Sequence, residues 1–191
     1  MMNYKDRFYD ALAKTKELTL TIDNIKLQHE LSVEEIRSML GVAVKALYRH
    51  GYKNSSMLAK KCIPVHLLVQ QEIASLLGLT TYITIGDRFW ADDDIYCKMS
   101  YDDIKTELNS PQILNPIKCH TWLTLTDGTI LDFTSEAHLD VITDRGIHPT
   151  EKCFQVILPS DSSANSYHRP FLVGDDFLYK TGAVRKGTLP Y

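Results

Sequence analysis

Three residues that could together carry out nucleophilic chemistry occur in the order Cys62, His120 and Asp132. A cysteine thiolate attacks carbonyl carbons, a histidine can exchange a proton near neutral pH, and a carboxylate can fix the histidine tautomer. Cys62 follows two lysines and directly precedes an apolar helical pattern that starts at Pro64. A helix amino terminus and neighbouring cations both stabilise a thiolate, and the N–H groups of the first turn can hold an oxyanion. Cys62 is therefore the candidate nucleophile.

Each of these residues also has an ordinary explanation when it is taken alone. A single cysteine is more often packed inertly under a helix. His120 alone fits a strand histidine, and Asp132 alone fits a carboxylate at a strand end or turn. His66 lies one turn after Cys62, and we expect it to be a partly exposed helix histidine. Only the combination of the three residues favours catalysis.

Hairpin geometry provides a test of that combination, because His120 and Asp132 flank one turn. If Asp127-Gly128 forms a two-residue turn, Asp132 faces Leu123 and points away from His120. If a three-residue loop ends with Gly128 in the left-handed region, Asp132 faces Trp122 and shares a face with His120 as its diagonal neighbour. The catalytic hypothesis requires the three-residue loop.

The elements that must position these residues can be read from periodicity and capping signals. Ser32 and Glu35 form a capping-box pattern, and Gly51 and Gly78 supply helix stops. Helices are predicted over about 4–15, 33–50 and 64–77, with a short one near 101–108. Strands are predicted over 80–85, 119–126, 129–134 and 153–158 and around 177–179, and residues 167–171 form either a lid or a segment against the sheet.

Taken in order, the residues over about 62–134 resemble the transglutaminase-like branch of the papain-like thiol enzymes. That family shows a Cys that opens a helix, a Gly about fifteen residues later, a second Gly eight positions after the first, a His-x-Trp strand and an Asp-x-Thr strand. Here Gly78 and Gly86 have this spacing, His120 precedes Trp122, and Asp132 precedes Thr134. The chain departs from the family in its two lysines before Cys62, in the sixteen positions from Cys62 to Gly78, and in Pro64.

The resemblance implies an α+β fold in which the nucleophile helix packs on an antiparallel sheet, with extra amino-terminal helices. We expect one domain over 1–191, with a helical part at 1–50, a catalytic core at 62–134 and an extension of unknown role at 140–191. The implied activity is acyl transfer, as a peptidase, amidase or transamidase, through a Cys62 thioester with His120 as base and Asp132 as its orienting group. The alternative is a catalytically silent domain of the same kind that binds a peptide or protein.

Composition limits the partners of the chain. The 191 residues are 44% hydrophobic and carry a net charge of −3, so no global positive field exists to hold nucleic acid or an anionic membrane. The charged amino terminus lacks the apolar core of a signal peptide, and we expect a cytoplasmic protein with unpaired cysteines. The expected substrate is a peptide, a protein or a small amide.

Competing motifs are weaker, and no cofactor is predicted. A zinc site from Cys97, Cys119, His120 and Cys153 lacks a Cys-x-x-Cys knuckle. The run at 92–94 is three aspartates without the glycine and terminal glutamate of a calcium loop. No Walker loop, nucleophile elbow or dinucleotide fingerprint occurs.

Overall fold

The protein is represented by a computed structural model that describes residues 3–22, 25–28, 31–90, 95–111, 117–161 and 167–185. The acidic run at 92–94 lies outside these residues.

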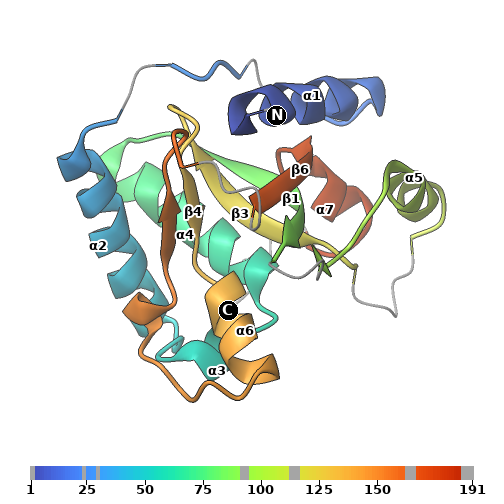
Figure 1. Ribbon diagram of the computed structural model, residues 1–191. Helices are drawn as coiled ribbons and strands as arrows, with labels where there is room; N and C mark the ends of the chain where they lie inside the picture. Colours follow the sequence, from blue (N-terminus) through green and yellow to red (C-terminus); the bar gives the residue numbers. More distant parts are fainter. Residues whose placement is uncertain are drawn as a thin grey trace. The chain divides into compact units, whose positions relative to one another are not determined.

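The described residues form helices and antiparallel strands, so the chain belongs to the α+β class (Figure 1). The helices are α1 (Tyr4–Glu17), α2 (Val33–Arg49), α3 (Ser55–Leu58), α4 (Cys62–Leu77), α5 (Tyr101–Asn109), α6 (Ser135–Ile142) and α7 (Asp176–Lys180), with a 3₁₀ helix η1 (Thr150–Lys152). The strands are β1 (Thr81–Phe89), β2 (Ile95–Tyr96), β3 (His120–Leu125), β4 (Ile130–Asp132), β5 (Gln155–Ile157) and β6 (Tyr167–Val173).

The chain divides into two compact units that interleave along the sequence. The first unit comprises residues 1–26, 83–121 and 159–190, and the second comprises 27–82, 122–158 and 191. Strands β1 and β3 each begin in one unit and end in the other. The single domain expected from the sequence stays a prediction.

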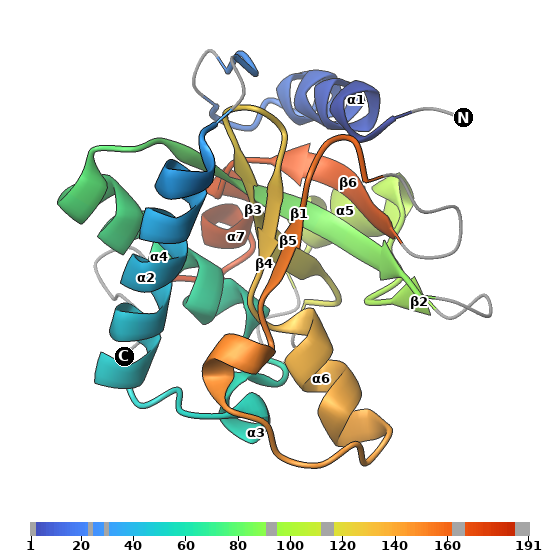
Figure 2. The ribbon, with the colours of Figure 1, turned by 60° about the vertical axis from the view of Figure 1, so that its left-hand side comes forward.

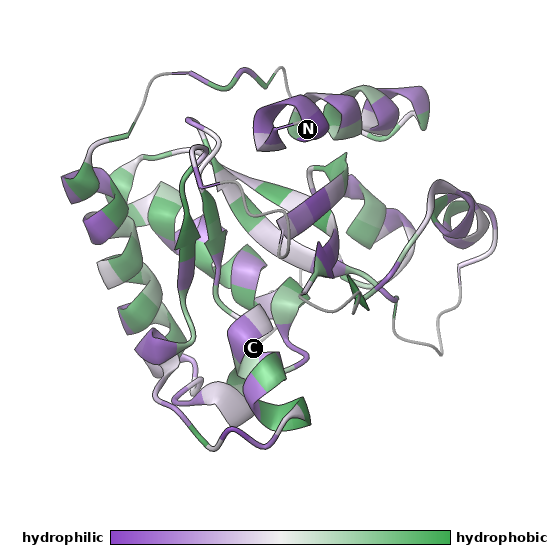
Figure 3. Ribbon diagram, in the orientation of Figure 1, coloured by the Kyte–Doolittle hydropathy of each residue, from purple (hydrophilic) through white to green (hydrophobic). Residues whose placement is uncertain are grey.

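In the first unit, β1 pairs antiparallel with both β2 and β6, with a register shift at Ile85/Gly86 in the pairing with β6. Helix α1 packs on β6. Hydrophilic and hydrophobic residues alternate along this helix (Figure 3), and its buried members include Phe8 and Leu12. Burying one face of an amphipathic helix is the usual source of its stability. Residues 167–171 are therefore strand and not a lid.

In the second unit, β3, β4 and β5 form an antiparallel ladder (Figure 2). Helix α2 packs against α4, and α3 packs against α6. Trp122, Leu123 and Phe133 are fully buried, so the hairpin lies at the centre of this core. The Ser32–Glu35 capping box at the start of α2 is present as predicted.

Three sequence predictions need correction. Helix α4 begins at Cys62, two residues before the predicted start, and β1 continues beyond Gly86 to Phe89. The strand expected around 177–179 is instead helix α7. Phe177 and Leu178 are both buried, and two adjacent buried side chains do not fit a strand with one solvated face. Elements α3, α6 and β2 are absent from the ranges predicted from the sequence.

Within the described residues, no helix is both long and apolar enough to cross a lipid bilayer.

Candidate functional site

Cys62 is the first residue of α4, and its side chain is buried with 7% of its surface exposed. Lys61 is the N-cap residue and makes no side-chain capping bond. The first helical hydrogen bond joins the backbone N–H of Val65 to the Lys61 carbonyl. Pro64 fits the third helical position because an N–H in the first turn of a helix needs no intrahelical acceptor. The thiol therefore belongs to the first residue of a sixteen-residue helix, at the end where the helix dipole is positive.

Two exposed lysines precede the thiol, and the first of them has an unusual backbone. Lys60 has a φ of 62°, in the left-handed region that glycine favours. The chain turns there before it enters α4 through Lys61. These side chains keep two positive charges in solvent within two residues of Cys62.

His66 is fully buried, so the expectation of a partly exposed helix histidine is wrong. Its Nδ1 lies 2.7 Å from the carbonyl oxygen of Cys62, and its Nε2 lies 3.1 Å from the backbone nitrogen of Phe133. A carbonyl can only accept and an amide N–H can only donate, which assigns the neutral tautomer with the proton on Nδ1. His66 therefore fastens the first turn of α4 to the end of β4.

Asp132 is also fully buried, and it organises the start of α6. Its Oδ1 accepts hydrogen bonds from the backbone nitrogens of Thr134 at 3.0 Å and Ser135 at 3.1 Å. The same oxygen lies 3.7 Å from Nε2 of His66. A carboxylate that accepts backbone N–H groups at a helix amino terminus is stabilised in its charged form. The carboxyl group of Asp132 is thereby held in one orientation.

The hairpin between β3 and β4 has the three-residue loop on which the catalytic hypothesis depends. Leu123 pairs with Leu131, and the backbone nitrogen of Leu125 donates to the Thr129 carbonyl at 2.8 Å. Gly128 has a φ of 93°, which is the positive value that this loop demands. Continuing the register by one pair places Asp132 opposite Trp122. The alternative two-residue turn, which would have opposed Asp132 and Leu123, is excluded.

His120 is the first residue of β3 and lies two positions before Trp122 on that strand. Side chains two apart on a strand point to the same face. Within the first unit, the His120 ring is packed against Tyr96 with a centroid distance of 5.1 Å and against His168 with one of 6.0 Å. Trp90 in turn stacks on Tyr96 at 5.0 Å. His120 is therefore a fully buried histidine in an aromatic setting.

The three predicted residues are divided between the two units. Cys62 and Asp132 belong to the second unit, and His66 connects their immediate surroundings. His120 belongs to the first unit, at the point where β3 passes into the second. The union of His120 with Cys62 and Asp132 stays a prediction.

No known protein family model matches the chain, and neither curated proteins nor solved structures yield a significant match.

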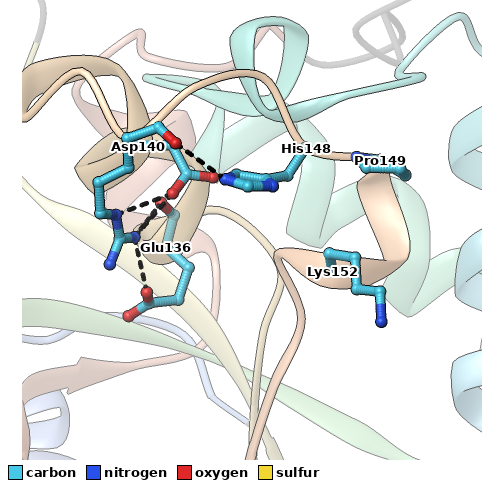
Figure 4. Close-up of a pocket in the computed structure, with 6 residues that line it drawn as sticks. Glu136, Asp140, His148, Pro149 and Lys152 are labelled. Carbon is cyan, nitrogen blue, oxygen red and sulfur yellow. Dashed lines mark hydrogen bonds and ion pairs between the residues drawn. The ribbon is translucent and has the colours of Figure 1, made fainter.

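A surface pocket of about 450 Å³ lies in the second unit, beside α6 and η1 (Figure 4). Arg145 donates to Oδ1 of Asp140 at 2.9 Å and to Oε2 of Glu136 at 2.9 Å. The hydrogen bond from Arg145 to Glu136 is the largest of the causes that raise the pKa of Arg145. The imidazole of His148 points toward the carbonyl oxygen of Arg145, which lies 3.2 Å from His148 Nε2. The charges of Arg145, Asp140 and Glu136 in the pocket are thus paired with one another. The pocket is large enough for a small molecule, and neither a cysteine nor a serine is among the described residues that line it.

The four cysteines are not paired with one another in disulfides. Cys97 and Cys119 belong to the first unit, whereas Cys153 belongs to the second. The Cys153 thiol lies 3.6 Å from the carbonyl oxygen of Pro149. Burial, assisted by nearby carboxylates, raises the pKa of Cys153 to about 12. Cys153 is consequently an inert thiol at neutral pH.

Two residues with roles in this region went unrecognised in the sequence. The structural role of His66 depends on Phe133, which is sixty-seven residues away, so no local pattern could reveal it. His168 lies on β6, whose alternating burial pattern was detectable as a period of two over residues 167–171.

Proposed function

We propose that this protein is a thiol-dependent acyl-transfer enzyme of the transglutaminase-like, papain-like type. Cys62 is the nucleophile, His120 is the general base and acid, and Asp132 orients His120. The observation that carries the proposal is the three-residue loop at Gly128, because only that register puts His120 and Asp132 on one face of the hairpin. The position of Cys62 at the amino end of α4 supports it independently.

The proposed reaction has two halves. In the first, the Cys62 thiolate bonds to the carbonyl carbon of an amide or ester, and His120 donates its proton to the departing amine or alcohol as the carbon–heteroatom bond breaks. In the second, His120 takes a proton from water or from an amine, which attacks the thioester and releases the Cys62 thiolate. Water gives hydrolysis and an amine gives transamidation. We expect backbone N–H groups of the first turn of α4 to stabilise the oxyanion of both steps.

His66 is the nearest histidine to Cys62 in the sequence, but its hydrogen bonds argue against it as the base. Its Nδ1 proton is donated to the Cys62 carbonyl, and its Nε2 lone pair accepts the Phe133 amide. Taking up a further proton on Nε2 would break the second bond and bury a cation. His66 therefore supports the site as a structural group.

The finer features of the proposal follow from the same residues. A nucleophile helix against an antiparallel sheet is the core arrangement of papain-like enzymes, and α4 is fastened to the end of β4 by His66. The substrate is an amide or ester of a peptide, a protein or a small molecule. A cytoplasmic location is proposed because four cysteines stand as thiols.

A second candidate function is a catalytically silent domain that binds a ligand. The pocket beside α6 favours it, since about 450 Å³ is within the usual range for small-molecule sites. In that case Cys62→Ala leaves ligand affinity unchanged, whereas the enzyme loses nearly all activity.

Acylation by an activated ester tests the proposal directly. Incubation with p-nitrophenyl acetate should release p-nitrophenolate and add one acetyl group, which peptide mass spectrometry locates on Cys62 and hydroxylamine removes. Cys62→Ser is the matched control, and Cys153 serves as an unreactive thiol in the same molecule. Acetylation of Cys62 no faster than that of a small cysteine peptide would contradict the proposal.

A further inference from the structure

His120 and His168 form a buried pair of imidazoles within the first unit. Their side chains are 0% and 1% exposed, and their ring centroids are 6.0 Å apart with an interplanar angle of 33°. One ring nitrogen of His120 lies within 4.8 Å of one ring nitrogen of His168. The two residues come from β3 and β6, which are separated by more than forty residues of sequence. Two histidines brought together at this depth need a physical reason.

We propose that this pair binds a divalent transition-metal ion, with Zn²⁺ as the representative case. Neutral imidazole nitrogen is the commonest protein ligand for such ions, and Zn²⁺, Cu²⁺ and Ni²⁺ all accept it. Magnesium and calcium prefer oxygen ligands and should not compete.

The spacing suits two bonds to one ion. A Zn–N bond is about 2.0–2.1 Å, so two ligating nitrogens can lie at most about 4.2 Å apart. The upper limit of 4.8 Å exceeds that span by roughly 0.6 Å, which small rotations of the two rings can remove. Water molecules can complete the coordination, as they do in open metal sites.

Aromatic rings lie next to the pair. The His120 ring contacts the Tyr96 ring at a centroid distance of 5.1 Å. Trp90 stacks on Tyr96 at a centroid distance of 5.0 Å, so this neighbourhood is aromatic. The side chain of Tyr96 is half-buried.

Metal binding here does not depend on the proposed function, but its consequence does. If His120 is the base, an ion on its nitrogen occupies the lone pair that must take the proton. Zn²⁺ would then slow acylation of Cys62 reversibly, and a chelator would restore it. The chain would carry a metal-sensitive inhibitory site.

Zn²⁺ titration of the whole reduced protein against a chromophoric chelator tests the binding. We expect one ion per chain and at least a tenfold loss of affinity in His120→Asn and in His168→Asn. His148→Asn is the matched control because that histidine is exposed and belongs to the second unit, and Cys97→Ser checks the thiol that follows Tyr96 in the sequence. Unchanged affinity in His168→Asn, or a loss equal to it in Cys97→Ser, would overturn the proposal.

Ligand identity in the parent protein supplies the second measurement, which is needed if the asparagine variants fail to fold. X-ray absorption at the zinc edge counts imidazole ligands without any substitution. Two imidazoles support the site, and fewer than two overturn it. Acylation of Cys62 is measured alongside, so metal binding without inhibition would refute the role of His120 as base and leave the metal site standing.

Discussion

Two buried histidines of this protein show opposite ways of using an imidazole. His66, in the second unit, is bonded at both nitrogens by backbone groups, the Cys62 carbonyl and the Phe133 amide. His120, in the first unit, has ring neighbours, Tyr96 and His168. The first arrangement fixes one tautomer of His66, whereas the His120 ring packs against other rings. On the proposed mechanism, proximity to Cys62 in the sequence is a poor guide to which histidine exchanges protons.

The two histidines should differ in what their loss changes. Loss of His66 should weaken the attachment of α4 to the end of β4, with an effect visible in unfolding. Loss of His120 should act chiefly on the reactivity of Cys62.

Replacing His120 with Gln should slow acetylation of Cys62 by p-nitrophenyl acetate by about 10²–10⁴-fold, the usual contribution of a general acid–base group. Glutamine keeps a polar side chain but cannot accept the thiol proton. Acetylation kinetics by mass spectrometry measure the effect, and urea unfolding provides the stability control. A rate within about threefold of the parent, with folding intact, would remove His120 from the mechanism.

Cys153 should react with iodoacetamide about 10³-fold more slowly at pH 8 than a cysteine in a short peptide. Burial raises the pKa of this thiol to about 12, so only about one molecule in 10⁴ holds a thiolate at that pH. The thiol of the unfolded chain loses its proton first, so folding stability from this group should fall as pH rises from about 8.5 to 12. Per-cysteine alkylation rates with and without urea provide the measurement. Equal rates in the two conditions would contradict the burial argument.

Replacing His66 with Ala should lower the free energy of unfolding by about 2–5 kcal/mol, because two buried backbone groups lose their partners. Urea denaturation followed by circular dichroism measures the change. The matched control is His148→Ala, since that side chain is exposed and should shift stability by less than about 0.5 kcal/mol. Similar losses in the two variants would deny His66 its fastening role.

The smallest effect is expected at the start of α2. Ser32 Oγ accepts a hydrogen bond from the Glu35 backbone nitrogen, and Glu35 bonds back to Ser32, so Ser32→Ala should cost about 1 kcal/mol. Hydrogen bonds from Ser32, first from its side chain and then from its backbone, lower the pKa of Glu35. Any stabilisation by this carboxylate should therefore be present above the ordinary glutamate pKa and disappear as pH falls through the lowered value. Urea midpoints at pH 7 and pH 3 check both statements, and a larger cost at pH 3 would contradict them.

The parts of the fold that were predictable from sequence are those with local signals. Helices α1, α2 and α4 have apolar residues at helical spacing, and Ser32 and Gly78 mark two of their ends. The loop at Gly128 could be reduced to two alternatives, but the choice between them required the register. Helix α7 was missed because Phe177 to Tyr179 has the composition of a strand, and tertiary burial overrode that propensity.

The candidate site was only partly predictable for the same reason. Cys62 could be found because its chemistry depends on a local feature, the start of α4. The roles of His66 and Asp132 depend on backbone groups that the fold brings to them, the Phe133 amide for His66 and the turn into α6 for Asp132. The His120–His168 pair joins two distant strands, and no spacing rule connects them.

The most direct test of the central claim is the alkylation rate of each cysteine by iodoacetamide as a function of pH, in the parent and in His120→Ala. We expect Cys62 to be alkylated fastest, and to react well below pH ~8.5, where an ordinary thiol titrates. In His120→Ala the alkylation rate of Cys62 should fall to that of an ordinary thiol, because the proposed mechanism makes the imidazole the group that favours the thiolate. If Cys62 titrates like Cys97, or resists alkylation until the chain unfolds, the protein is not a thiol enzyme of this kind.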